Sequence, residues 1–334
     1  VHAPGHIQGN SRLAARRWPC NKQHSSPIWC HLSLVIRAVT RSLENEVSNM
    51  RSVLTLIANP QTRKLSMDDL EAVRRAVPEA GAPAWLAEDI ACDLLVDIDP
   101  AELHAVEAAA RAALESEPID IIAQGTDHRR KALLIADMDS TVIRQECIDE
   151  LAAEAGIGPH VADITERAMR GELAFEPALR ERVKLLEGLP EAKLEQVFET
   201  RITLSPGIRT VTDTMRLNGG YCALVSGGFT FFTARVAVAA GFDTNRANIL
   251  EMKDGHLTGT VADPILGRAA KLESLQELAA EHSLAMEATM AVGDGANDLA
   301  MIEAAGIGVA YHAKPVVAQA APARLDYTDL TSLL

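Results

Sequence analysis

The amino-acid sequence predicts an α/β protein: a doubly wound parallel sheet with an inserted helical cap, preceded by a small α+β part. Three observations support this fold class. After residue 127, short apolar runs alternate with helical patterns, which is typical of strand–helix–strand units. A helical block at about 145–200 interrupts that alternation, so it should form a separate cap. Between residues 50 and 126, strand and helix signals follow the order β-α-β(β)-α-β.

Residues 1–49 mix Pro, His, Trp, Ser and Arg without a sustained period. Six Lys/Arg against two Glu give this segment a charge of +4. An Arg-rich, acid-poor leader is typical of an organellar transit peptide. The alternative, which we favour, is an upstream extension without structural role, because Met50 begins the first clean strand-like pattern. We expect the segment to be poorly ordered and exclude it from the fold prediction.

Residues 50–126 are expected to form a small sandwich of the ferredoxin-like type. No residue in this part suggests catalytic chemistry, and its place before an enzyme-like body resembles the small ACT-like regulatory domains of amino-acid enzymes. A dimerisation module is an equal alternative, and a homodimer would fit either. The predicted elements are a strand at 52–58, a helix at 67–77 after Ser66, one or two strands within 85–98, a helix at 101–116 after Pro100 and a strand at 119–123.

Residues 127–334 are expected to form a Rossmann-like body. The run Ala132–Ala136 is wholly apolar, as in a parallel strand buried on both faces, and it ends abruptly at Asp137. In such sheets the ligand binds beyond the carboxyl ends of the strands. The remaining predicted elements are strands at 221–225, 289–292 and 307–310, helices at 229–240, 271–282 and 298–305, and a hairpin of 249–253 with 256–261 that turns at Asp254-Gly255.

Charge and composition limit the classes of partner. The chain of 334 residues carries a net charge of −14, so the part after residue 49 carries −18 once the +4 is subtracted. Such an acidic body argues against nucleic acid or an anionic membrane as partner. The five cysteines show no CxxC pair, and no apolar run reaches the roughly 18 residues that span a bilayer. We expect a cytoplasmic protein with reduced thiols.

The first candidate site is the acidic sequence Asp137-Met-Asp139-Ser-Thr141, directly after a buried strand. If the strand geometry continues, both carboxylates point the same way. Two acids in a partly dry site are unfavourable unless a cation or a shared proton relieves them. A helix N-cap with acidic neighbours is the alternative reading of this sequence alone.

A second acidic cluster, Gly293-Asp294-Gly-Ala-Asn297-Asp298, follows another short apolar run. Its glycines permit a tight turn close to a ligand, and its side chains offer the oxygen donors that a hard divalent cation selects. Two carboxylate clusters at the ends of two strands of one sheet predict a single site.

Two further groups complete this predicted site. Ser226-Gly227-Gly228 follows the strand at 221–225 and offers a hydroxyl and N–H groups that suit phosphate oxygens. Lys271 is expected at the start of a helix, where the helix dipole disfavours a cation. Its charge makes better sense if it reaches a phosphate.

These four elements, in this order and spacing, resemble the motifs of the haloacid dehalogenase superfamily of phosphatases. Within it, the stretches 137–152 (DMDSTVIRQECIDELA) and 167–190 (RAMRGELAFEPALRERVKLLEGLP) resemble the phosphoserine phosphatases. The resemblance implies magnesium-dependent hydrolysis of O-phospho-L-serine to L-serine, the last step of serine biosynthesis. A phosphatase or phosphotransferase for another small phosphorylated alcohol is the alternative, and a non-catalytic amino-acid sensor is a third.

The resemblance also implies a role for each residue. Asp137 is the nucleophile, and Asp139 is the proton donor and acceptor. Mg²⁺ is bound by Asp137, Asp294 and the backbone carbonyl of Asp139. The remaining implied roles belong to Ser226, Gly227, Lys271 and Asn297 on the phosphate, Glu146 on the substrate amino group, Arg182 on its carboxylate, Asp298 as support for Lys271, and Met169 and Phe175 as walls of the pocket.

Overall fold

The computed structural model describes residues 52–115, 117–169 and 172–334. All of them belong to one compact unit, Met50–Leu334. The expectations for residues 1–49 lie outside the described residues. In the part of the chain that the structure describes, no helix is long and apolar enough to cross a membrane.

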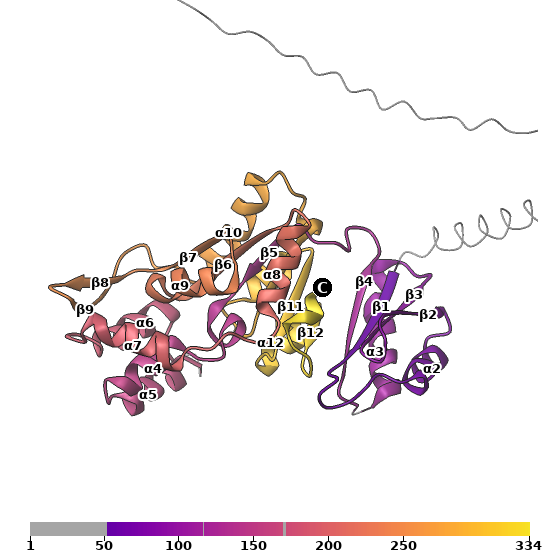
Figure 1. The fold of residues 1–334 in the computed structure, drawn as a ribbon, viewed down its shortest axis with the longest axis horizontal. Coiled ribbons are helices and arrows are strands. Elements are labelled where there is room, and N and C mark those ends of the chain that lie inside the picture. The colour runs from indigo at the N-terminus through magenta and orange to yellow at the C-terminus, as the bar shows by residue number, and fades with distance from the viewer. Residues whose placement is uncertain (1–51, 116, 170–171) are drawn as a thin grey trace, which may run out of the picture. The chain divides into compact units, whose positions relative to one another are not determined.

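The N-terminal part is a four-stranded antiparallel sheet in the order β2-β3-β1-β4, with two helices on one face (Figure 1). Leu54 and Leu56 of β1 point into the core beneath the helices, whereas Ile57 joins the core of the larger part. The ferredoxin-like prediction is confirmed at the level of topology, and the regulatory or dimerisation role stays a prediction. The elements are β1 (Ser52–Ala58), α2 (Met67–Ala76), β2 (Ala80–Ala87), β3 (Ala91–Val96), α3 (Leu103–Leu114) and β4 (Ile119–Gly125).

Two local signals account for the helices of this part. Ser66 caps α2 in a reciprocal capping box with Asp69, which explains the sharp start of that helix. The helix predicted at 101–116 is shorter than expected, because Pro100–Glu102 form a 3₁₀ turn and α3 begins at Leu103. The range 85–98 contains parts of two strands, β2 and β3, which form a hairpin.

The larger part contains a six-stranded sheet in the order β12-β11-β10-β5-β6-β7, parallel throughout. The chain runs outward from β5 in both directions, so the order reverses between β5 and β10. A doubly wound sheet binds ligands at this point, beyond the carboxyl ends of the strands. The strands are β5 (Leu133–Ala136), β6 (Tyr221–Phe229), β7 (Thr244–Asn248), β10 (Thr289–Gly293), β11 (Ile307–Tyr311) and β12 (Ala323–Leu325).

Helices cover both faces of this sheet, and the core divides accordingly. Val211 and Phe232, from α8 and α9, pack with Leu134 on one face, whereas Leu275 and Met301, from α10 and α11, pack with Leu133 and its neighbours on the other. The helices are α8 (Ile208–Leu217), α9 (Thr230–Ala240), α10 (Arg268–Glu281), α11 (Leu299–Ala304) and α12 (Pro315–Ala320), with 3₁₀ turns at Met286–Ala288 and Leu330–Leu333.

Sequence patterns missed α8, β7, α12 and β12. Strand β7 reads Thr-Asn-Arg-Ala-Asn and lies at the sheet edge, so it lacks the apolar run used to find the others. Strand β6 also continues through Ser226–Phe229, where we expected a turn.

The cap consists of the predicted helical block and a hairpin that we had not assigned to it (Figure 1). The backbone N–H of Leu257 donates to Leu189 and that of Gly188 donates to Leu257, so the hairpin joins the loop between α6 and α7. The cap elements are α4 (Cys147–Glu154), α5 (Gly158–Met169), α6 (Phe175–Lys184), α7 (Glu191–Arg201), β8 (Leu250–Lys253) and β9 (His256–Val261).

Asp120, a fully buried residue of β4, links the two sheets. Its carboxylate accepts hydrogen bonds from the backbone N–H groups of Asp326, Tyr327 and Thr328, and from the Thr328 hydroxyl at 2.7 Å. Three N–H donors stabilise a buried charge that would otherwise be unfavourable. The loop after β12 is thereby attached to the N-terminal sheet.

Candidate active site

The two acidic clusters meet, as predicted, at the carboxyl ends of the neighbouring strands β5 and β10. Asp137 and Asp294 are buried, and both line one cavity of about 800 Å³ with Asp139. The chain between Asp137 and Val142 forms a kinked turn in which Ser140 has a φ of 55°. This turn returns Asp139 to the cavity, where its Oδ1 accepts the Cys147 backbone N–H at 2.8 Å.

Lys271 lies near the start of α10, as predicted, and its role on a phosphate stays a prediction. Its side chain is completely buried, and its Nζ is 2.7 Å from Asp137 Oδ1 and 2.6 Å from Asp298 Oδ1. Burial alone would lower the pKa of this amine, but the two carboxylates outweigh that effect and raise it. Lys271 therefore stays charged and is paired with Asp137 and Asp298, and it is not among the residues that line the cavity. The role of Asp298, which the resemblance gave as orienting Lys271 or a metal-bound water, stays a prediction.

Asp137 has one carboxylate oxygen that is fixed and one that is not. Its Oδ1 accepts the backbone N–H of Met138 at 2.8 Å as well as the Lys271 ammonium. Within the described residues, the structure gives Oδ2 no hydrogen-bond donor. A carboxylate held through one oxygen can present the other to a ligand.

The pKa values of the acids reflect their crowding. Burial, with the charges of Glu146 and Asp137, raises the pKa of Asp139 to about 8. Burial, with the charges of Asp137 and Asp298, raises the pKa of Asp294 to about 7. Both carboxyls hold their protons more tightly than exposed acids do, which suits a proton donor at Asp139. The raised pKa of Asp294 indicates that negative charge exceeds positive charge around this carboxyl.

The acid cluster fits a divalent metal ion. One oxygen each of Asp137, Asp294 and Asp298 lies within 4.8 Å of the others, and all three residues are buried. The Thr141 hydroxyl donates to Asp294 Oδ1 at 3.2 Å and fixes its orientation. Lys271 offsets only part of this negative charge, and carboxylate oxygens are the ligands that hard divalent cations prefer. Both oxygens of Asp298 already have a donor, Lys271 on Oδ1 and the Gly295 N–H on Oδ2, whereas Asp137 is held through Oδ1 alone. Asp137 and Asp294 are therefore the better side-chain ligands.

The end of β6 forms a cradle beside these acids. The Ser226 hydroxyl donates to Asp139 Oδ2 at 3.4 Å and accepts the Gly228 backbone N–H at 2.9 Å. A Cβ on Gly228 would lie 2.7 Å from Asp139 Oδ2, so a larger residue would displace the carboxylate. Gly293 must be small for a similar reason, because a Cβ there would collide with the Asp298 carboxylate.

The cap supplies the opposite wall of the cavity. Arg182, on α6, is partly buried, and its pKa is lowered by burial and raised in part by the charges of Asp149, Glu146 and Asp139. Glu146 lines the same cavity and accepts the Ser140 hydroxyl at 2.7 Å. The Phe175 ring lies against Gly227, 3.0 Å from where a Cβ would stand.

The structure thus brings together nearly all of the predicted residues. Asn297, Gly227 and Ser226 line the cavity with those described above, and Lys271 and Asp298 lie beneath it. Met169 ends α5, and its side chain lies outside what the structure describes.

Sequence reasoning missed the cavity-lining cations Arg268 and Lys314. Lys314 lies in the short loop between β11, which ends at Tyr311, and Pro315, the first residue of α12. The same rule that located Asp137 and Asp294, polar residues in the loop after a parallel strand, could have pointed to it.

Comparisons with known proteins give a consistent result. Residues 134–303 match the model of the haloacid dehalogenase-like hydrolase family. The chain is 41% identical over 248 residues to a phosphoserine phosphatase of Archaeoglobus fulgidus, which covers 74% of this chain and 72% of that protein.

Two solved structures are similar to this chain. A haloacid dehalogenase family hydrolase from Salmonella enterica serovar Typhi aligns with a TM-score of 0.75 and 31% identity, over 85% of this chain and 97% of that one. A phosphoserine phosphatase solved as a phospho-aspartyl intermediate analogue aligns with a TM-score of 0.57 and 40% identity, over 61% of this chain and 97% of that one.

Replacement of Lys271 by Met should destabilise the protein strongly, because two buried carboxylates would lose their shared cation. We expect a loss of about 3–5 kcal/mol in the free energy of unfolding, measured by urea titration in the presence of EDTA. Adding Asp298→Asn to this variant should recover part of the loss, because it removes one unpaired charge.

Lys184→Met is the matched control for that measurement. Lys184 is 63% exposed and pairs only with the exposed Glu187, so its loss should change stability by less than about 0.5 kcal/mol. Equal stabilities of Lys271→Met and Lys184→Met would contradict a structural role for the buried ion pairs.

Proposed function

The chain belongs to the haloacid dehalogenase-like hydrolases, and we propose that it is a magnesium-dependent phosphoserine phosphatase. The observation that carries the proposal is the placement of Asp137 and Asp139 in one cavity with a phosphate-sized cradle, facing Arg182 and Glu146 of the cap. Such an enzyme is a phosphoric monoester hydrolase, and its reaction would be the last step of serine biosynthesis.

Residues at the edge of the sheet suit the phosphate group. The Ser226 hydroxyl and the neighbouring glycine N–H groups can donate to its oxygens, and the positive charge of Lys271 lies directly beneath Asp137. Asn297 adds an amide on the opposite side of the cavity. Phosphate-ester hydrolysis depends mainly on positioning and on charge stabilisation, and this cradle offers both.

Asp137 and Asp139 have different roles in the proposed reaction. Asp137 attacks phosphorus through its free oxygen; the phosphorus–oxygen bond to serine breaks, and an aspartyl-phosphate forms. Asp139 gives its proton to the departing serine oxygen, for which its raised pKa of about 8 prepares it. A water molecule then attacks phosphorus and returns a proton to Asp139, which frees phosphate and restores Asp137.

Mg²⁺ is the ion we propose for the acid cluster, held by the side chains of Asp137 and Asp294 and by the backbone carbonyl of Asp139. When bound, it supplies positive charge that offsets the repulsion between carboxylate and phosphate.

Charges on the cap suit the two ends of an amino acid. Arg182 can bind a carboxylate through two parallel N–H groups, and the Glu146 carboxylate can accept an ammonium group. Phe175 and Leu179 form an apolar wall between the cap and the cradle and exclude water from the ester. A phosphate ester of a small amino acid satisfies all of these groups together.

Phosphate release from a panel of esters tests this function. We expect rapid release from phosphoserine with Mg²⁺, slower release from phosphothreonine and sugar phosphates, and loss of activity with EDTA. Asp137→Asn should remove turnover, because the amide is a far weaker nucleophile. Preference for a sugar phosphate would overturn the proposed substrate, and Mg²⁺-independent turnover would overturn the proposed cofactor.

Arg182→Lys tests the substrate carboxylate contact. Loss of the bidentate contact should remove about 1.5–3 kcal/mol and so reduce kcat/KM for phosphoserine about 10- to 150-fold, mainly through KM. The same variant should hydrolyse p-nitrophenyl phosphate, which lacks a carboxylate, as wild type does. Arg180→Lys, on the same helix but outside the cavity, is the matched control. Equal losses for both esters would contradict the assigned role.

A further inference from the structure

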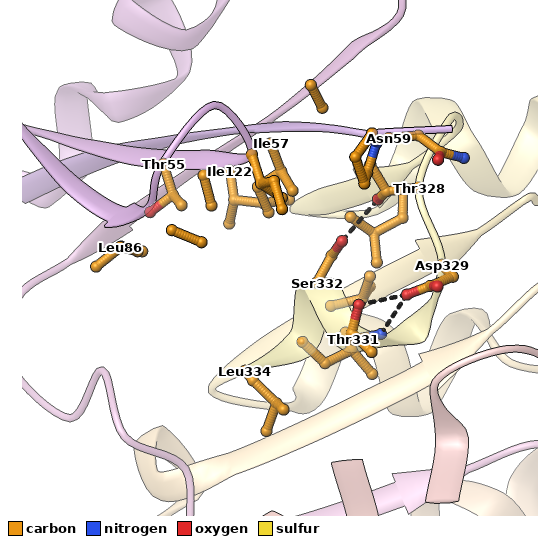
Figure 2. Close-up of a pocket in the computed structure, with 18 of the residues that line it drawn as sticks. Thr55, Ile57, Asn59, Leu86, Ile122, Thr328, Asp329, Thr331, Ser332 and Leu334 are labelled. Atoms are coloured by element: carbon orange, nitrogen blue, oxygen red, sulfur yellow. Dashed lines mark hydrogen bonds between the residues drawn. The ribbon is translucent and has the colours of Figure 1, made fainter. Parts of the chain in front are cut away.

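A second cavity, of about 530 Å³, lies between the N-terminal sheet and the parallel sheet (Figure 2). It shares no lining residue with the active-site cavity. Its volume is within the range of small-molecule sites, about 300–1,000 Å³, and such sites occur preferentially where two structural layers meet.

Aliphatic side chains form the walls of this interdomain cavity. Ile57 and Ile122 project from the N-terminal sheet, and Met290, Ile307 and Val309 project from β10 and β11. Leu86 and Leu334 stand at its edge and are 55% and 59% exposed. Apolar walls with exposed apolar groups at the edge favour a ligand with a hydrocarbon body.

The charged groups of the cavity already have partners. Arg129 pairs with Asp93, with Nη1 2.5 Å from Oδ2, and Asp93 also accepts the Thr55 hydroxyl at 2.8 Å. Asp329 accepts the backbone N–H and the hydroxyl of Thr331. An anionic ligand would therefore lose hydration without gaining a free cation, because Arg129, the cation among the described lining residues, is already paired, so the cavity disfavours a negatively charged molecule.

A neutral polar group on the wall remains available to an uncharged ligand. Gln124, on β4, lines the cavity and is partly buried, and within the described residues the structure gives its side-chain amide no hydrogen bond. A ligand with one neutral donor or acceptor can satisfy this amide.

Fixed elements hold the cavity open. The hydrogen bonds of Asp120 attach the loop after β12 to β4, and the Asn59 side chain donates to the Tyr327 carbonyl at 3.1 Å. Because both walls are fixed by these bonds, the empty volume does not close by side-chain movement alone.

The interdomain cavity also shares elements with the active site. Met290 lies on β10, the strand that leads to Asp294. From the loop beside Asp329, the Leu330 N–H donates to Pro206, and the Ser205 N–H donates at 2.8 Å to Val142, at the end of the turn that carries Asp139. A ligand that displaces β10 or this loop would therefore act on Asp294 and on the turn that carries Asp139.

We propose that the interdomain cavity is a second ligand site, which takes a small, uncharged, largely apolar molecule with one hydrogen-bonding group, and that its occupancy changes turnover. Indole has these properties and serves as the probe.

Calorimetric titration of the full chain with indole tests the binding. We expect one site with a Kd of roughly 10 μM to 1 mM, as suits a ligand of this size, and a negative heat-capacity change from apolar burial. Indole-3-carboxylate, which adds a charge to the same ring, should bind at least about tenfold more weakly. Absence of binding, or equal binding of the charged probe, would overturn the proposal.

Variants that fill the interdomain cavity test whether indole binds there. Ala91 lines the cavity and is partly buried, so Ala91→Phe should abolish indole binding. Ala87→Phe, at an exposed lining position, serves the same purpose if the first variant fails to fold. Ala82→Phe, also exposed on β2 but outside the cavity, is the matched control and should bind indole as wild type does. Retained binding in both cavity-filling variants would place the site elsewhere.

Turnover measurements test whether occupancy of the interdomain cavity changes catalysis. Saturating indole should change kcat or KM at least about twofold in wild type and in Ala82→Phe, and should have no effect in the folded cavity-filling variants. Unchanged kinetics at saturation would refute the coupling. Calorimetry requires no turnover, and kinetics can use any ester that the enzyme hydrolyses. Failure of the proposed ligand site is therefore distinguishable from failure of the proposed function.

Discussion

The active site depends on the electrostatics of Asp137, whose carboxylate is buried next to two further acids. Such crowding is unfavourable in a dry environment unless positive charge compensates it. Lys271 supplies one charge from below, and it can approach because Gly293 leaves room for the Asp298 carboxylate that orients it. The remaining negative charge faces the cavity, so the folded chain is complementary to a divalent cation and to the phosphate that the cation accompanies. The excess negative charge that destabilises the site without a cation therefore favours the binding of a divalent cation.

The sheet explains why residues from four distant segments meet. Strands β5, β6 and β10 are neighbours and parallel, so the residues that follow them reach one edge together. The cap brings the remaining groups, and the hairpin β8–β9 extends it through backbone hydrogen bonds. In the proposed function, substrate choice and chemistry therefore belong to different layers, because Arg182 and Glu146 lie on the cap side and Asp137 and Asp139 lie at the sheet edge.

Much of this could be predicted from the sequence, because buried parallel strands are apolar runs and the polar residues after them mark the site. Asp137, Asp294 and Ser226 were located in this way, and the similarity of the cap added Arg182 and Glu146. Contacts between distant segments could not be predicted. Local patterns placed Lys271 at the start of a helix but gave no sign that its side chain is completely buried. Neither the Asp120 bonds nor the interdomain cavity has a local signal, since each requires two separately folded surfaces to meet.

The central claim is that Asp137 bonds covalently to phosphorus, and rapid-quench mass spectrometry tests it most directly. Enzyme mixed with phosphoserine and Mg²⁺, quenched in acid within milliseconds and digested, should yield a peptide containing Asp137 that is heavier by one phosphoryl group, and hydroxylamine should remove the added mass. With p-nitrophenyl phosphate, whose leaving group needs no proton from Asp139, we expect this adduct to accumulate further in Asp139→Asn, which cannot activate the hydrolytic water. Turnover without any phosphoryl adduct at Asp137, at every quench time and in both proteins, would contradict it.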